Sequence, residues 1–188
     1  MSLPMRIVVR SAALIAFSIA CGYAKLLLFP YLLFVELFTV ALFVSGAIVG
    51  RAWGMWVGMV ARLVFSVANP LGPAHPWVLA AQVLGGAFVG FLGGAARPWL
   101  LPGPGRPEPG PRSQSAILAA AGLLGTVGYD LATNLAQGVV FGSIPVTLAA
   151  SALPAGQHLI SNLVLFVLLG NFLFPWLRRH PLGLADAA

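Results

Sequence analysis

The stretch that decides the fold reads GYDLATN, residues 128–134, and it lies inside an apolar run from about residue 115 to residue 140. A carboxylate such as that of Asp130 costs at least about 2.5 kcal/mol at the centre of a bilayer, so it needs a partner. Asp130 and Asn134 are four residues apart and share one helix face, with Tyr129 and Thr133 on the adjacent strip. The stretch therefore predicts a membrane helix on which other polar side chains converge.

The composition places the whole chain in the membrane class. Of its 188 residues, 60% are hydrophobic and only 7% are charged, whereas a soluble domain has about 25% charged residues. Several windows of about 20 apolar residues predict an all-α polytopic membrane protein. The first apolar run lacks a convincing cleavage site, so we interpret it as a retained helix. The single cysteine, Cys21, permits no intrachain disulfide.

The apolar runs predict six transmembrane helices in a single domain covering residues 1–188. The run 31–68 would measure about 57 Å as one helix, which is too long for one crossing, so it must fold back at residues 50–54. Prolines and glycines predict a rigid loop at 69–76 and a flexible linker at 97–114. The expected helices cover residues 8–29, 31–49, 52–68, 77–96, 115–138 and 155–177.

The basic residues predict the orientation in the membrane. They gather at one set of helix ends, for example at Arg6, Arg51, Arg97 and Arg178, while the opposite loops contain no Lys or Arg. The positive-inside rule then makes both termini and the linker 97–114 cytoplasmic. The formal charge of +6 reflects this topology. Because the arginines form no patch or stripe, nucleic acid is not an expected partner.

With this orientation, most polar side chains of the helices fall in their outer halves. An outward-facing, polar-lined cavity under loop 69–76 is the simplest explanation. Loop and aromatic residues beside these polar groups complete the candidate substrate-binding set. That set consists of Glu36, Arg62, Asn69, His75, Trp77, Gln82, Tyr129, Asp130, Asn134, His158 and Asn162.

Structural explanations stay open for several of these residues. Arg62 with Glu36 or Asp130 is either an intramembrane ion pair or a set of ligand contacts. Asn134 and Asn162 are either ligand contacts or interhelical hydrogen-bonding groups of the kind common in membranes. His158, near the interface, is either part of the site or simply solvated, and Trp77 is either a ligand contact or an interfacial anchor.

Small residues at four-residue spacing form flat ridges that allow close helix approach. The glycine ridges, at 46–58 and 86–94, are explained by packing inside the bundle. The first helix carries an alanine ridge, which is also available to a partner protein. Its members are Ala12, Ala16, Ala20 and Ala24.

The sequence contains none of the motifs expected of an enzyme. It has no Walker motif, metal-ligand cluster, nucleophile elbow or pair of catalytic aspartates. We therefore expect no catalytic residues, no metal site and no resident cofactor. Because a nucleotide-binding element is missing, energy-driven transport would need a motor on another subunit.

Five segments resemble the substrate-binding S components of energy-coupling-factor (ECF) vitamin transporters, and the resemblance covers nearly the whole chain. Its motifs are loose, since S components for different vitamins share little sequence. The segments are Glu36, the glycine-rich stretch 46–58, NPLGP at 69–73, YDLATN at 129–134 and HLISN at 158–162.

The resemblance implies a six-helix binding subunit in the cytoplasmic membrane of a prokaryote. Such proteins bind a water-soluble vitamin or cofactor precursor on the outer side, through helices 4–6 and the outer loops. Ala12, Ala16 and Ala20 match the surface that docks on a transmembrane coupling subunit, which carries two ATPase subunits. The S component is thought to topple in the membrane to release its cargo. Glu36 with Arg62 maps to no particular vitamin, which leaves open a zwitterionic or amide-rich ligand and a purely structural pair.

Two other functions are compatible with the sequence. A non-transporting scaffold of the cell-shape type has a similar size and helix number, and its polar residues would serve helix packing. A solitary vitamin carrier that works without a motor is the other alternative. Neither the ligand nor its affinity follows from the sequence.

Overall fold

The computed structural model describes residues 3–28, 36–70 and 72–180, and the regular structure of these residues is entirely helical. The all-α class is therefore confirmed, and six helices occupy the described ranges, as expected. In chain order they are α1 (Leu3–Leu28), α2 (Leu37–Val49), α3 (Arg51–Val67), α4 (Pro76–Leu100), α5 (Pro111–Val140) and α6 (Ile144–Arg179).

Four of the described helices, α1, α4, α5 and α6, are long and apolar enough to cross a membrane. Their outer faces expose large hydrophobic side chains such as Phe17, Leu131 and Phe172. A surface of this kind is stable against lipid rather than water, so the chain is a membrane protein. α2 and α3 are shorter: 13 and 17 residues rise only about 20 and 26 Å, against about 30 Å for a hydrocarbon core.

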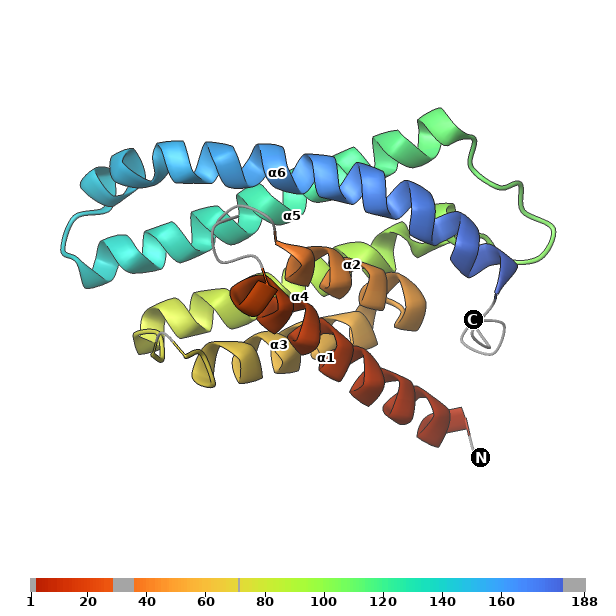
Figure 1. Cartoon of the computed structure of the whole chain (residues 1–188), viewed down its shortest axis with the longest axis horizontal. Coiled ribbons are helices and arrows are strands. Elements are labelled where there is room, and N and C mark those ends of the chain that lie inside the picture. Colours follow the sequence, from red (N-terminus) through yellow and green to blue (C-terminus); the bar gives the residue numbers. More distant parts are fainter. Residues whose placement is uncertain (1–2, 29–35, 71, 181–188) are drawn as a thin grey trace.

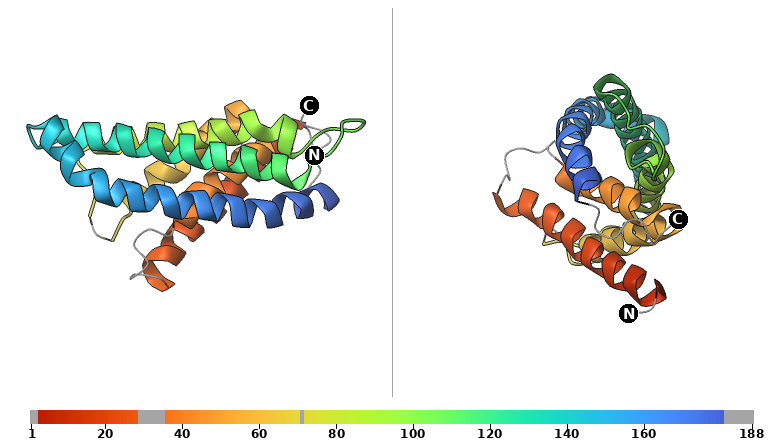
Figure 2. Two further views of the ribbon diagram at one scale, coloured as in Figure 1. Left: turned by 90° about the horizontal axis from the view of Figure 1, so that it is seen from above. Right: turned by 90° about the vertical axis from the view of Figure 1, so that its right-hand side faces the viewer.

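α2 forms the centre of the bundle. Every residue from Phe38 to Val49 is buried, and α2 contacts α1, α3, α4 and α6. Apart from Thr39 and Ser45, its side chains are apolar on every face, which is typical of a helix enclosed by other helices. Figure 2 shows α1 lying on the outside of the bundle, where it packs against α2 and α3.

Glycines bring α2, α3 and α4 into backbone contact. A Cβ atom added at Gly90 of α4 would collide with the carbonyl oxygen of Gly54 in α3, and one added at Gly46 of α2 would collide with that of Gly90. Gly50 joins α2 to α3 with a φ of 90°, a conformation that glycine adopts at little cost. The chain thus folds back within the segment that the sequence indicated.

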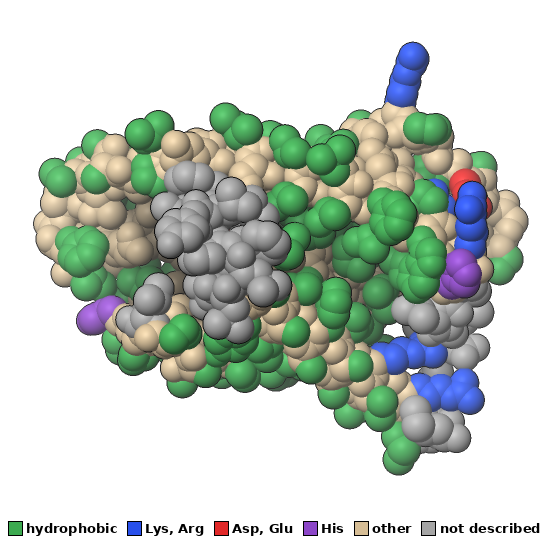
Figure 3. Space-filling model, viewed as in Figure 1, with side chains coloured by type: hydrophobic (Ala, Val, Ile, Leu, Met, Phe, Trp, Pro, Cys, Tyr) green, Lys and Arg blue, Asp and Glu red, His purple; other side chains and the backbone are tan. Residues whose placement is uncertain are grey.

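The helix ends fall into two groups at opposite ends of the molecule (Figure 1). One end holds the start of α1, the α2–α3 junction, the connection between α4 and α5, and the end of α6. The other holds the loop after α3 and the short α5–α6 turn. The Lys and Arg side chains visible in Figure 3 lie toward the first end. This grouping is the one that the basic residues predicted; which end faces the cytoplasm stays a prediction.

The long helices extend further than the prolines suggested. α4 continues through Pro98, so the connection to α5 covers only 101–110 instead of 97–114. α6 begins at Ile144 rather than near 155 and contains Pro154. Figure 2 shows that α6 changes direction in its first part, close to its connection with α5. Pro111 and Pro145 lie in first helical turns, where a missing N–H costs nothing. Residues 29 and 31–35, which we expected to be helical, lie outside the described ranges.

Candidate functional site

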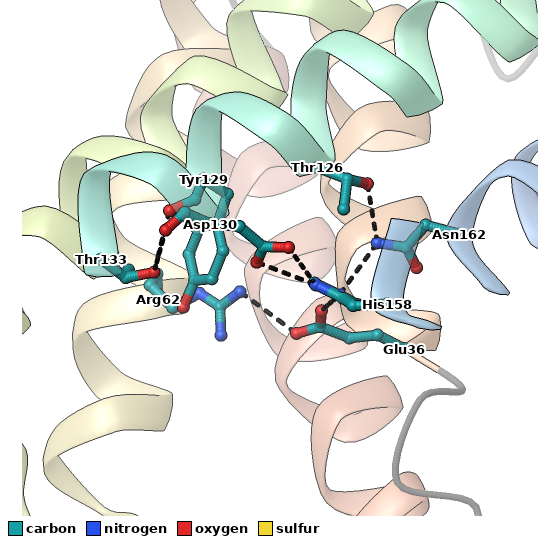
Figure 4. A network of polar contacts seen from close by, with 8 residues as sticks. All are labelled: Glu36, Arg62, Thr126, Tyr129, Asp130, Thr133, His158 and Asn162. Carbon is teal, nitrogen blue, oxygen red and sulfur yellow. Dashed lines mark hydrogen bonds and ion pairs between the residues drawn. The ribbon is translucent and has the colours of Figure 1, made fainter. Parts of the chain in front are cut away.

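Four ionisable side chains from four separate elements meet in what we call the ionic cluster: Glu36, Arg62, Asp130 and His158 (Figure 4). Glu36 precedes the first residue of α2, while the others lie on α3, α5 and α6. Asp130 is about 15 Å along the helix axis from the end of α5 at Val140. The cluster therefore lies within the apolar length of α5, beside the start of α2.

His158 joins the two acidic side chains. Its Nε2 lies 2.6 Å from Oε2 of Glu36, and its Nδ1 lies 2.9 and 3.0 Å from the two carboxylate oxygens of Asp130. An ionised carboxylate only accepts hydrogen bonds, so each contact needs a proton on the ring nitrogen or on the carboxyl group. The imidazole thus ties α6 both to α5 and to the start of α2, which is 122 residues away along the chain.

Arg62 is a buried cation held by one carboxylate and two aromatic rings. Its Nη2 donates a hydrogen bond of 3.3 Å to Oε1 of Glu36. Its guanidinium carbon lies 4.5 Å from the ring centroids of both Phe38 and Tyr129. Such stacking stabilises a cation more strongly when water is excluded, and the Arg62 side chain is only 5% exposed.

Asn162 and Thr126 extend the cluster into the protein interior. Both residues are almost completely buried. Nδ2 of Asn162 donates to Oγ1 of Thr126 over 2.9 Å and lies 3.0 Å from Nε2 of His158. Oδ1 of Asn162 has no hydrogen-bond partner among the described residues. The Asn162 amide thus contacts the ionic cluster, and one of its two polar atoms makes no hydrogen bond with the described residues.

α4 borders the ionic cluster with glycines, which leave room for side chains of α3 and α5. A Cβ atom at Gly85 would collide with the Tyr129 ring, and one at Gly86 would lie 2.8 Å from Cβ of Arg62. Two consecutive glycines therefore allow Tyr129 and Arg62 to pack directly on the α4 backbone.

The structure brings together part of the residue set predicted from the sequence, namely Glu36, Arg62, Tyr129, Asp130, His158 and Asn162 (Figure 4). The other predicted residues lie away from the ionic cluster or at its edge. His75 precedes α4 and accepts a hydrogen bond of 3.4 Å from the backbone nitrogen of Trp77; the Trp77 side chain is 65% exposed. Asn69 belongs to the α3–α4 loop, where its carbonyl accepts a bond from the Gly72 nitrogen.

Gln82 and Asn134 lie on helices that border the cluster. Gln82 is one helical turn before Gly86 on α4, and its Oε1 is buried without a partner in the described part of the chain. Asn134 follows Asp130 by one turn on α5 and is half-buried.

Thr126 and Phe38 belong to the site, although the sequence did not single them out. Thr126 precedes Asp130 by four residues, and that spacing places both on one face of α5. That spacing could have identified Thr126 as a member of the site. Nothing in the sequence could have identified Phe38, because an aromatic residue in an apolar helix looks like any other core residue.

A second polar network lies at the opposite end of α5 and α6, where the sequence predicted few polar groups. Nε2 of Gln114 donates to Oδ1 of Asn171 over 2.8 Å, and Nδ2 of Asn171 donates to Oγ of Ser115 over 2.8 Å. Nη1 of Arg178 donates to Oε1 of Gln114 and to the carbonyl of Leu100, each over 2.9 Å. These bonds join α4, α5 and α6 and serve helix packing.

Where the sequence predicted a polar cavity under loop 69–76, the structure shows ionisable side chains that bond to one another. Glu36, Asp130 and His158 nevertheless retain side-chain exposures of 14–17%. A cavity of about 440 Å³ lies at the other end, between the end of α4 and the start of α5, where Trp99, Arg106 and Glu108 line it.

The alanine ridge of α1 points away from the bundle. Ala12, Ala16 and Ala20 are exposed, whereas α1 packs inward through residues such as Ser18, whose hydroxyl lies 3.4 Å from that of Ser45 in α2. Internal packing within the described residues therefore does not use these three alanines.

The ionic cluster is suited to binding a small polar solute. In the described ranges no group of three or more His, Cys, Asp or Glu side chains is arranged to hold a metal ion. The guanidinium, imidazole and two carboxyl groups of the ionic cluster can exchange internal partners for the polar atoms of such a solute. Comparison of the chain with protein-family models, curated proteins and solved structures finds no match.

Proposed function

We propose that this chain is the substrate-binding subunit of an ECF-type importer and captures a water-soluble vitamin or cofactor precursor at the ionic cluster. One observation carries the proposal: four ionisable side chains from four elements converge within the apolar part of a membrane protein. Ionisable groups are costly there and usually mark the path or the binding site of a substrate.

The packing of the bundle supports a functional role for these charges. The apolar residues of α2 fill the core, and glycine contacts bind α2 and α3 to α4 without any charged group. Replacing a buried ion pair by apolar residues of similar volume is often neutral or stabilising. Helix association alone therefore gives no reason to bury Glu36, Arg62, Asp130 and His158 together.

The proposed partners follow from the exposed ridge on α1. Ala12, Ala16 and Ala20 offer a flat surface on which a transmembrane coupling subunit can pack closely. In the proposed assembly that subunit carries two ATPases, which supply the energy that this chain has no motif to provide. The chain would reside in a prokaryotic cytoplasmic membrane, with the ionic cluster nearer the outer face.

The cluster also fits a second candidate, a non-transporting membrane scaffold. The specific observation is that its four charged groups already pair with one another. In a scaffold those pairs would fix the relative positions of α2, α3, α5 and α6, and the alanine ridge would bind a cell-shape partner.

Native mass spectrometry of the detergent-purified protein, expressed alone and together with a coupling subunit and its ATPases, tests the proposal. We expect a small molecule that co-purifies with the wild type, is lost from Asp130→Ala, and is retained by the control Asn171→Leu at the other end of α6. We also expect a complex with the coupling subunit.

Three contrary results are informative. Ligand binding without the complex would identify a solitary carrier. A complex with cell-shape proteins and no ligand would favour the scaffold. A ligand that Asp130→Ala binds as tightly as the wild type would remove the ionic cluster from the site.

A further inference from the structure

The cavity between the end of α4 and the start of α5, which we call the α4–α5 cavity, has a lining of mixed polarity. Its volume is about 440 Å³. The charged members of the lining, Arg106 and Glu108, come from the connection 101–110, whereas the apolar members Pro98, Trp99 and Ile117 come from the helices. The cavity uses no residue of the ionic cluster, so its role is independent of the proposed function.

The polar groups of the α4–α5 cavity favour an anion. Oε2 of Glu108 lies 3.1 Å from Nε of Arg178, so this carboxylate is already compensated. Arg106 is exposed and forms no ion pair within the part of the chain that the structure describes. A guanidinium group can bind a phosphate through two parallel hydrogen bonds. The hydroxyl of Ser113 and the first N–H groups of α5, which Gly110 cannot cap with a side chain, add further donors.

One wall of the cavity continues along the lipid-facing side of α5. Ile117, Leu124 and Leu131 follow one another at seven-residue spacing, which places them on one face of the helix. Leu124 and Leu131 are both exposed. Because large apolar side chains on the surface of a membrane protein face lipid, this wall leads from the cavity into the hydrocarbon region.

Aromatic side chains of α4 lie beside this face. Trp99 lines the cavity, and Phe88 precedes it by about three helical turns, so the two share one face of α4, and both are exposed. A Cβ atom added at Gly128 of α5 would lie 2.8 Å from the Phe88 ring, so the ring packs against α5 between the positions of Leu124 and Leu131. Trp99 itself ends an apolar helix beside arginines, where tryptophan typically marks the membrane interface.

We propose that the α4–α5 cavity binds the headgroup of an anionic phospholipid, with the phosphate at Arg106 and Ser113 and an acyl chain along the exposed faces of α4 and α5. A soluble phosphate compound would use only the charged part of this surface. A zwitterionic lipid would bring an ammonium group toward Arg106, and the juxtaposition of like charges is unfavourable.

Native mass spectrometry of the complete chain, released from lipid nanodiscs, tests the headgroup preference. The nanodiscs contain equal amounts of dioleoyl phosphatidylglycerol and dioleoyl phosphatidylethanolamine, which differ only in the headgroup. We expect the wild type to retain phosphatidylglycerol in preference by about fivefold, the effect of one arginine near an anionic lipid surface. Equal retention of the two lipids, or a preference for phosphatidylethanolamine, overturns the inference.

A pair of charge variants links the preference to the cavity. Arg106→Gln should abolish it, because the substitution removes the unpaired cation. Arg51→Gln is the matched control, since Arg51 is also exposed and lies at the same end of the molecule but does not line the cavity. Both positions are on the surface, so both variants should melt like the wild type. If neither variant loses the preference, or both lose it equally, the lipid does not bind at Arg106 and the inference is wrong.

Two further measurements distinguish a lipid from a soluble anion. Glycerol phosphate, which carries the phosphate without acyl chains, should not displace phosphatidylglycerol from the wild type. Trp99→Ala should lower the occupancy of phosphatidylglycerol several-fold, whereas Trp53→Ala, at an exposed tryptophan outside the cavity, should not. Displacement by glycerol phosphate would assign the cavity to a soluble phosphate compound and overturn the lipid assignment, as would unchanged occupancy in Trp99→Ala.

Discussion

At the scale of single residues, Arg62 is the side chain whose environment is most specific. Its guanidinium pairs with Glu36 and lies between the rings of Phe38 and Tyr129. Lysine cannot reproduce this arrangement, because its ammonium group is not planar and cannot stack on two rings at once.

Arg62→Met should therefore destabilise the protein. Methionine fills a similar volume but removes the Arg62–Glu36 pair, and breaking a buried pair by removing one partner costs about 3 kcal/mol or more. Thermal unfolding in detergent micelles measures the loss. Arg112→Met, at an exposed position of α5, is the control and should melt like the wild type. Equal melting temperatures for the two variants would show that Arg62 is not held as described.

The residues of the site were only partly accessible to sequence reasoning. Asp130, Glu36 and His158 stand out because each is ionisable within an apolar run, and intramembrane charge is a strong signal. The sequence does not show which of these residues pair. Glu36 and His158 are 122 residues apart, so helical periodicity cannot relate them, and only the packed bundle shows that they touch. Phe38 contributes through the face of its ring, a property that its position in the sequence does not indicate.

At the scale of elements, the contact between α3 and α4 depends on missing side chains. Gly90→Ala should destabilise the protein by about 1–3 kcal/mol, the usual cost of overpacking a close contact. The added methyl group would collide with the carbonyl of Gly54 and push the two helices apart. Thermal unfolding in the same detergent checks this value.

Gly156→Ala is a matched control for that experiment. Gly156 also lies inside a helix, but a Cβ atom there meets nothing within 4 Å. Alanine favours a helix interior over glycine by about 1 kcal/mol, so this variant should melt at or above the wild-type temperature. If both glycine variants behaved alike, helix propensity and not interhelical contact would govern the α3–α4 pair.

The lengths of the apolar runs correctly predicted the number and order of the helices, but they did not predict where several of the helices begin and end. Glycine at position 50 correctly marked the fold-back, because a positive φ interrupts the helix there. Prolines were misleading. Pro98 and Pro154 lie inside α4 and α6, where a membrane environment and neighbouring helices favour helical backbone despite a lost hydrogen bond. Pro111 and Pro145 begin helices instead of preceding them.

At the scale of the whole molecule, the unused alanine ridge predicts how the protein assembles. Ala16→Trp should abolish association with the coupling subunit, because a large ring prevents close approach at a small-residue surface. Ligand binding in detergent should be unchanged, since Ala16 is exposed on the outside of α1 and is not one of the four residues of the ionic cluster. Co-purification of the two proteins measures the first effect and calorimetry the second.

Ala120→Trp provides the control for this prediction. Ala120 is exposed on α5, away from the α1 ridge, so a ring there should leave the complex intact. Full association of the Ala16→Trp variant would mean that the coupling subunit, or any other partner, binds another face.

The burial of α2 has a consequence for the order in which the protein is made. A ribosome delivers α2 before α4 and α6, which later enclose it, so the helix must first reside in lipid and afterwards exchange lipid neighbours for protein. Until α6 arrives, the carboxylate of Asp130 lacks its contact with His158. A nascent chain stopped at residue 143 should therefore insert but remain recognisable to membrane quality-control proteases, and pulse–chase labelling should show it decaying faster than the complete chain. The carboxylate that α5 brings into the membrane thus acquires its imidazole partner only when the following helix, α6, has been synthesised.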